Sequence, residues 1–307
     1  MSQVILSAKN LTKKYSQVTA LEGVHMELKR GEIYGLVGKN GAGKTTFLRL
    51  ITGQAFQTEG TLSLFGATSQ RDLNEQRKRI GAIIEIPSFI PYMTAEQNLE
   101  YYRLQRGIPG KECVKEVLKE VGLQDTGKKK YKSFSLGMKQ RLGLALALMN
   151  KPELLLLDEP INGLDPFGIV ELRNLLIKLS REKNITILIS SHILTELSNL
   201  ATYYGFIDNG KLLRQLSADE ISQDNNKYIE LRVDKVEAMA ALLETKLGCI
   251  SYKITPNFEI HLYDYLDQPT KISQLAVNNG IGLYSMTVKD IDLESYFIQL
   301  VGGNANA

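Results

Sequence analysis

The feature that most constrains the fold is the segment GKNGAGKT at Gly38–Thr45. It follows the short apolar run IYGLV and precedes TTFLRLIT, a helical pattern that Gly53 ends. Glycines let the backbone N–H groups of such a loop turn inward around an anion, and the following helix points its positive N-terminus at the same place. The pattern therefore predicts a strand–loop–helix unit, a P-loop, that cradles a polyphosphate.

Individual side chains of this loop are expected to contact the bound group. Lys44 is expected to meet the β- and γ-phosphates, and Thr45 to supply a hydroxyl to Mg²⁺. The other expected nucleotide contacts are Gly38, Asn40, Gly41, Gly43 and Thr46. Lys44 is also a candidate catalytic residue, because its charge would lie on the phosphates that react.

A second motif, LLLLDEP at Leu154–Pro160, predicts a magnesium site opposite the loop. The leucines are typical of a strand buried on both faces, and Asp158 lies at its carboxyl end, where open α/β sheets bind ligands. Magnesium usually takes one or two protein carboxylates together with phosphate oxygens and water, so Asp158 with Thr45 is a sufficient set. Glu159 is then available to orient or deprotonate the attacking water.

The pattern along the chain predicts two domains. Residues 1–222 combine a β-rich N-terminal part up to about Tyr34, a helical insert at about 94–150, and alternating strands and helices that imply a mostly parallel sheet. The polar stretch at Ser222–Lys227 lacks periodicity and marks the boundary. Residues 227–307 follow a βαββαβ-like order, which predicts a small α+β module of the ferredoxin-like type.

Composition excludes several classes of protein. The chain carries 37 basic and 34 acidic residues, a net charge of +3, so charge alone predicts no nucleic-acid partner. Its two cysteines, Cys113 and Cys249, lack metal-ligand spacing, and a reducing compartment fits best. No apolar run approaches the ~18 residues that a membrane helix needs, so we expect a cytoplasmic protein.

From about Leu6 to Gly210 the chain resembles the nucleotide-binding domain of ATP-binding-cassette (ABC) proteins. Ser135 in SFSLGMKQR matches the serine of the family signature, and Asp165, which ends INGLD, resembles the D-loop aspartate. His192 in SSHIL resembles the switch histidine, and Tyr15 the aromatic residue that stacks on adenine. The resemblance implies MgATP as the bound group, His192 contacting the γ-phosphate, and Ser135 with the Gly137 amide facing ATP on an opposite subunit.

The chain departs from the family pattern at two positions. The signature LSGGQ is replaced by Phe134-Ser135-Leu136-Gly137-Met138, and Glu85 stands where a glutamine loop is expected. Glu85 can still reach Mg²⁺ through water, and a glutamate followed by Pro-Ser-Phe resembles the ATPase subunits of bacitracin-resistance and lantibiotic-immunity exporters. In the family the following segment, here Pro87–Tyr92, receives a helix of the membrane subunit, so we expect Phe89, Ile90 and Tyr92 to be exposed.

These observations give one main hypothesis and two alternatives. The chain is predicted to be an ATPase subunit that dimerises on ATP, as a homodimer or paired cassette, and drives export of a peptide antibiotic through a separate transmembrane permease. It would then lie at the cytoplasmic face of the membrane, without nucleic acid. The alternatives are an ABC ATPase acting on ribosomes or DNA, and a subunit whose hydrolysis is impaired by Leu136, Met138 and Glu85. The role of the C-terminal module stays open.

Overall fold

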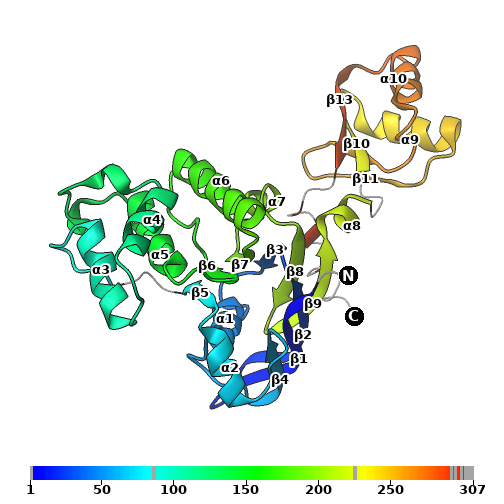
Figure 1. The fold of residues 1–307 in the computed structure, drawn as a ribbon. Coiled ribbons are helices and arrows are strands. Elements are labelled where there is room, and N and C mark those ends of the chain that lie inside the picture. The colour runs from blue at the N-terminus through cyan, green and yellow to red at the C-terminus, as the bar shows by residue number, and fades with distance from the viewer. Residues whose placement is uncertain are drawn as a thin grey trace. The chain divides into compact units, whose positions relative to one another are not determined.

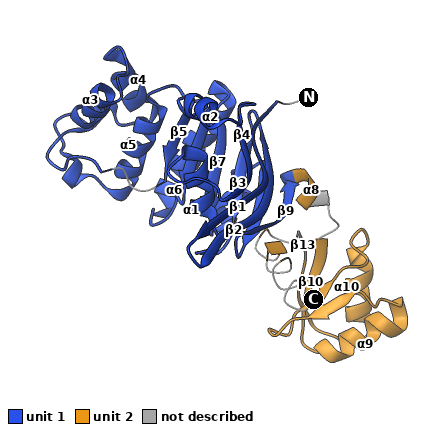
Figure 2. Cartoon of the chain, turned by 90° about the horizontal axis from the view of Figure 1, so that it is seen from below, with its two compact units in different colours: residues 1–218 blue, residues 219–307 orange. Residues whose placement is uncertain are grey.

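The computed structural model describes residues 3–84, 88–223 and 227–290, together with Leu293, Tyr296, Phe297 and Leu300. The chain divides into two compact units, Met1–Ala218 and Asp219–Ala307 (Figure 2). This division comes slightly before the predicted boundary at Ser222–Lys227, because helix α8, Ala218–Gln223, groups almost entirely with the second unit.

Unit 1 alternates strands and helices as the sequence pattern indicated (Figure 1). Its strands are β1 (Val4–Tyr15), β2 (Val18–Lys29), β3 (Ile33–Val37), β4 (Glu59–Leu64), β5 (Ile80–Ile83), β6 (Leu154–Asp158), β7 (Thr186–Ser191), β8 (Tyr203–Asp208) and β9 (Lys211–Ser217). Its helices are α1 (Lys44–Thr52), α2 (Gln70–Arg77), α3 (Ala95–Gln105), α4 (Glu112–Glu120), α5 (Leu136–Leu148), α6 (Pro166–Lys183) and α7 (Leu194–Ser198).

The core of unit 1 is a six-stranded sheet with the order β5-β6-β7-β3-β8-β9. Five strands run parallel, and β9 pairs antiparallel with β8 at the edge. Leu154–Leu157 and Thr186–Ser191 are buried along their whole length because helices cover both faces of the sheet. Since these parallel strands end at one edge, the residues after β3, β6 and β7 come together there.

A second, antiparallel sheet with the order β2-β1-β4 accounts for the β-rich N-terminal part. Its apolar side chains share one buried cluster with Phe47, Leu48 and Ile51 of α1 and with Leu156 of β6. Each such side chain contributes about 1.5–3 kcal/mol when it is fully buried. Packing against both sheets therefore holds α1, and with it the loop that precedes it, in a fixed position.

The predicted helical insert consists of α3, α4 and α5, which lie together to one side of the core sheet in Figure 1. Helix α3 begins at a capping box in which the Thr94 hydroxyl accepts from the Gln97 N–H and the Gln97 side chain accepts from the Thr94 N–H. Phe89 is buried against Tyr102 and Tyr131, so the expectation that it is exposed is wrong: an apolar ring beside two aromatic rings is more stable in the interior. Tyr92 is 71% exposed.

Unit 2 has the element order β10 (Lys227–Val233), α9 (Val236–Leu247), β11 (Tyr252–Ile254), β12 (Ile260–Leu262), α10 (Pro269–Asn278) and β13 (Leu283–Asp290). The sheet order is β11-β12-β10-β13 with antiparallel neighbours, as in the predicted ferredoxin-like arrangement. Ile229, Leu231 and Ile260 point to one face and form a core with Met239 and Leu243 of α9. The predicted last helix, from Leu293, lies largely outside the described residues.

Among the helices of residues 3–84, 88–223 and 227–290, none is both long and apolar enough to cross a bilayer.

Candidate functional site

The phosphate-binding loop joins the end of β3 to the start of α1, as predicted. Two of its glycines are required by close contacts: a Cβ atom on Gly38 would lie 2.4 Å from the Ile207 carbonyl oxygen, and one on Gly43 would lie 2.7 Å from that of Ala20. Gly43 also has φ 109°, in the region that disfavours side chains. These contacts hold the loop between β8 and the start of β2. Gly41, with φ 82°, and Asn40 are exposed, and Thr46 is half-buried in the first turn of α1.

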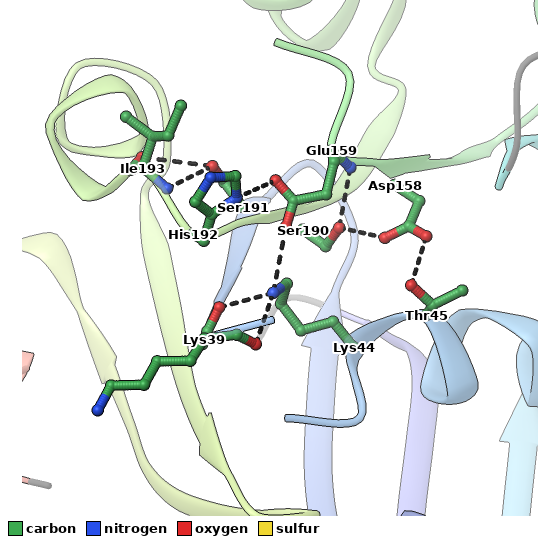
Figure 3. A network of polar contacts seen from close by, with 10 residues as sticks. Lys39, Lys44, Thr45, Asp158, Glu159, Ser190, Ser191, His192 and Ile193 are labelled. Atoms are coloured by element: carbon green, nitrogen blue, oxygen red, sulfur yellow. Dashed lines mark hydrogen bonds and ion pairs between the residues drawn. The ribbon is translucent and has the colours of Figure 1, made fainter. Parts of the chain in front are cut away.

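Lys44 is buried at the start of α1, and its ammonium group points back into the loop (Figure 3). The Nζ atom donates to the Gly38 carbonyl at 2.6 Å and to the Lys39 carbonyl at 3.1 Å. It also lies 3.1 Å from Oε1 of Glu159. The loop therefore already holds a desolvated cation beside its backbone, and a phosphate entering the loop would compete with these oxygens for that cation.

Asp158 lies at the carboxyl end of β6 and contacts two hydroxyl groups. Thr45 Oγ1 donates to Oδ2 at 2.7 Å, and Ser190 Oγ donates to Oδ1 at 2.5 Å. Asp158 on β6 and Ser190 on β7 lie opposite each other because the two strands pair in this register. A carboxylate and a hydroxyl this close are the hard oxygen ligands that Mg²⁺ accepts, so Thr45 and Asp158 fit the predicted metal site.

Glu159 follows Asp158 in a strained backbone conformation, with φ 47°. Such a conformation costs a non-glycine residue on the order of 1–3 kcal/mol and persists only where its surroundings enforce it. The Glu159 N–H donates to Ser190 Oγ at 3.0 Å, which provides one such constraint. The turn aims the side chain at Lys44 through Oε1 and at His192 through Oε2 (Figure 3).

His192 follows β7 directly, and its Nδ1 lies 2.7 Å from Oε2 of Glu159. An ionised carboxylate only accepts hydrogen bonds, so this contact requires the proton on Nδ1 and leaves Nε2 for a further partner. The imidazole is about one third exposed. The structure thus brings together five predicted site residues: Lys44, Thr45, Asp158, Glu159 and His192.

Ser190 is the functional-site residue that sequence reasoning missed. It is fully buried and joins Asp158 to the Glu159 backbone through its single hydroxyl. The sequence contains a weak signal for it, because a serine one residue inside the end of a buried strand carries a polar group that needs a partner. That partner follows only from the pairing of β6 with β7.

A second group of predicted residues lies at the N-termini of two other helices. Ser135 is the N-cap residue of α5, and its Oγ accepts from the Met138 N–H at 3.3 Å. Asp165 is the N-cap residue of α6, and its Oδ1 accepts from the Gly168 N–H at 2.7 Å. Helix α5 starts at Leu136, so Gly137 lies within its first turn. Within the described part of the chain, no hydrogen bond or ion pair joins Ser135 or Asp165 to the first group.

Tyr15 and Glu85 complete the predicted set. Tyr15 ends β1 with its ring 44% exposed and the Lys13 ammonium 4.6 Å from the ring centre. The β1–β2 hairpin to which it belongs also supplies Ala20, which lies against Gly43 of the phosphate-binding loop. Glu85 lies outside the described residues.

Among its described residues, unit 2 brings together three side chains of metal-binding type, Glu230, Glu259 and His261. Lys289 Nζ lies 2.6 Å from Glu230, and Arg232 Nη2 lies 2.5 Å from Glu259. Each carboxylate therefore has its own cation, and a metal ion would have to displace both. Burial lowers the pKa of His261, which stacks on Tyr228, and these contacts are typical of a structural histidine.

Fold and site together define the class of protein: a P-loop nucleotide hydrolase with an antiparallel N-terminal sheet and a helical insert between the loop and the DEP strand. Residues 21–162 match the model of the ABC transporter family. Among solved structures, the dimeric post-hydrolysis state of the ATP-binding cassette MJ0796 bound to ADP and Pi is 26% identical, with a TM-score of 0.63 over 70% of this chain and 99% of that one. The cassette cbiO1 from Clostridium perfringens is 25% identical, with a TM-score of 0.64 over 80% and 97%.

Curated relatives match over a greater length. The bacitracin transport ATP-binding protein BcrA of Bacillus licheniformis is 42% identical over 97% of this chain and 98% of its own. The lantibiotic transport ATP-binding protein SrtF of Streptococcus pyogenes is 42% identical over 70% of this chain and 92% of its own. The chain belongs to the ABC transporter family, as an ATP-binding subunit whose activity is ATP hydrolysis. The resemblance inferred from Ser135, Asp165 and His192 is thereby confirmed.

Proposed function

We propose that this ATPase drives export of a peptide antibiotic of the bacitracin type, and so confers resistance to it. The observation that carries this proposal is the extent of the similarity. The bacitracin relatives match 97% and 99% of this chain, unit 2 included, whereas the lantibiotic relative matches 70%. Of these relatives, only the bacitracin transport proteins match this chain along its whole length and so include unit 2. We therefore favour a bacitracin-like cargo over a lantibiotic.

In the proposed reaction the phosphate-binding loop and Lys44 hold the β- and γ-phosphates, and Thr45 with Asp158 holds Mg²⁺. A magnesium ion held there would neutralise charge on the phosphate oxygens. Glu159 orients and deprotonates the attacking water, while His192 holds the Glu159 carboxylate and contacts the γ-phosphate. The ion pair of Glu159 with Lys44 supports this assignment, because nucleotide binding would draw the ammonium to phosphate and release the carboxylate toward water.

We further propose that two cassettes close around two nucleotides, as a homodimer or as a paired cassette. The cassette MJ0796 was solved as a dimer. Ser135, Gly137 and Asp165 then face the nucleotide held by the opposite chain. In support of this, the Ser135 and Asp165 side chains accept from the N–H groups of their own helices, and among the described residues none of their hydrogen bonds reaches Lys44 or Asp158. Tyr15 stacks on the adenine, with Asn40, Gly41 and Thr46 around the phosphates.

The membrane partner is proposed to be a separate permease, with this chain bound peripherally at the cytoplasmic face. We propose that Tyr92 contacts that permease. Its side chain is exposed, and the Lys132 ammonium lies 4.8 Å from the centre of its ring. Phe89 is withdrawn from this role because it is buried. Glu85 remains the proposed second contact to Mg²⁺ through water.

The test is resistance in a bacitracin-sensitive host that expresses this chain with the permease encoded beside it. We expect the bacitracin concentration that inhibits growth to rise, with little change for a lantibiotic or for an unrelated small drug. The Lys44→Ala variant should abolish the increase, and Lys39→Ala, an exposed lysine of the same loop, should retain it. A chain that hydrolyses ATP with its permease and protects against neither peptide would contradict the proposed cargo.

A further inference from the structure

Leu136, the residue that replaces the first glycine of the signature, lies against the loop that follows Glu159. It is the first residue of α5, directly after the cap residue Ser135. Its Cδ2 atom is so close to Gly163 that a Cβ atom added to that glycine would lie 3.1 Å away. Gly163 has φ 77°, so the contact is with backbone in a conformation that other residues rarely adopt.

A second leucine completes this contact. The Leu164 side chain lies 3.8 Å from a Cβ atom built on Gly137 and 3.6 Å from one built on Gly168. These glycines belong to the first turns of α5 and α6. The two helix N-termini therefore pack on one leucine, and Leu136 covers the adjoining glycine. Leu136 is itself 38% exposed, so it covers Gly163 from the solvent side.

The loop that Leu136 touches is short and closely tied to Glu159. The Asn162 N–H donates to the Glu159 carbonyl at 3.2 Å, and the Leu164 N–H donates to the Ile161 carbonyl at 3.1 Å. Ile161 is buried, and the loop ends at the helix cap Asp165. Two consecutive turns thus run from the strained Glu159 backbone to the glycine under Leu136. The two turns share Ile161 and Asn162. A displacement of Gly163 would therefore also disturb the turn that is closed by the hydrogen bond from the Asn162 N–H to the Glu159 carbonyl.

We infer that Leu136 is a positioning residue: it presses on the Gly163 turn and thereby holds the backbone of Glu159 in its own chain. The inference rests on the proposed role of Glu159 and deepens it. A residue in the signature segment then acts on hydrolysis in its own chain, in addition to the role of Ser135 toward the opposite one. Leu136 therefore compensates for the missing glycine by a packing contact that a glycine cannot make.

The first test needs no nucleotide. Hydrogen–deuterium exchange of the peptide covering 159–168 is compared between the wild-type chain and Leu136→Gly. Loss of the contact should raise the exchange of the Asn162 and Leu164 amides by about tenfold or more, because their turns open more often. Leu104→Gly, the same change at an exposed position of α3, should leave this peptide unchanged. Equal exchange in Leu136→Gly and wild type would overturn the inference.

The second test separates action within a chain from action on the opposite chain. Leu136→Gly should lower kcat by about tenfold with KM within about twofold, and Leu136→Met, which can still cover Gly163, should restore most of the rate. Mixed dimers with differently tagged chains carry Glu159→Gln in one chain, so that only one intact Glu159 remains. Leu136→Gly should slow the remaining site when it is placed in the chain that carries the intact Glu159. It should have little effect when it is placed in the chain that carries Glu159→Gln.

The reverse pattern, or an equal loss in both arrangements, would overturn the inference. Failure of the proposed function has a different signature, namely a wild-type chain that binds no MgATP or hydrolyses none. In that case the exchange experiment still decides whether Leu136 holds the loop.

Discussion

Glu159 and His192 face each other across the ends of β6 and β7, with the carboxylate Oε2 2.7 Å from the imidazole Nδ1. The other carboxylate oxygen lies 3.1 Å from the Lys44 ammonium. Glu159 is therefore held between a cation of the phosphate-binding loop and a ring that follows the neighbouring strand. Both contacts join segments that are far apart in the sequence, and together they determine where a base can act.

Removing the charge of Glu159 should separate nucleotide binding from hydrolysis. Glu159→Gln keeps the size of the side chain but cannot take a proton, so turnover should fall by at least ~10². Binding of ATP should be retained, and dimers should accumulate because they no longer reopen. The measurements are phosphate release, nucleotide affinity and size-exclusion chromatography with ATP. Glu182→Gln, at an exposed position of α6, is the control. Undiminished hydrolysis in Glu159→Gln would remove Glu159 from the role.

Removing the imidazole should misdirect the same carboxylate. In His192→Ala the Glu159 carboxylate keeps only the Lys44 contact, and we expect turnover to fall about 10²-fold with ATP affinity less affected. His192→Gln should retain more activity, because an amide N–H can still donate to Glu159. The matched control is His25→Ala, which removes an exposed histidine whose Nδ1 accepts from the Asn10 N–H. Equal rates for His192→Ala and His25→Ala would show that the Glu159 contact does not assist hydrolysis.

Two neighbouring serines distinguish a role in the site from a role in folding. Both Ser190 and Ser191 are buried on β7, but only Ser190 contacts Asp158 and the Glu159 N–H. Each alanine variant should lose about 1–3 kcal/mol of unfolding free energy, measured by urea titration, because partly buried partners lose a hydrogen bond. Ser190→Ala alone should slow hydrolysis, by about tenfold, and raise the Mg²⁺ concentration needed for half-maximal rate. The same loss of rate in Ser191→Ala would assign both effects to stability.

Acid stability should depend in part on Glu153, which precedes β6. Hydrogen bonds from the Arg79 and Arg30 guanidinium groups lower its pKa from 4.5 to about 2, despite partial burial. A carboxyl group whose pKa is lower in the folded state stabilises the fold fully above its unfolded value and loses this contribution as pH falls. Wild type should therefore exceed Glu153→Gln in urea midpoint above pH 4.5, and the difference should shrink as pH falls toward 2. A difference that is independent of pH would contradict the ion pairs as its source.

The sequence predicted most elements of the fold because their signals are local. Gly53 ends α1 in a left-handed conformation, and Thr94 with Gln97 begins α3, at the positions that helix-capping rules indicate. The prediction for Phe89 was wrong because a proline-flanked apolar residue carries no sign of the aromatic rings it meets in the fold. The antiparallel pairing of β9 with β8 was likewise missed, since strand direction depends on a partner that periodicity does not name.

The site divides in the same way. The amino-acid sequence by itself determined the phosphate-binding loop and the Asp158–Glu159 pair, because glycine conformational freedom, a helix N-terminus and a strand end are properties of contiguous residues. Only the tertiary structure decided that Ser190 lies under Asp158, that Lys44 meets Glu159 and that Leu136 covers Gly163. These contacts depend on the strand order β5-β6-β7-β3 and on the packing of α5 against the start of α6. Such an arrangement is selected by the burial of the whole core, which no single segment specifies.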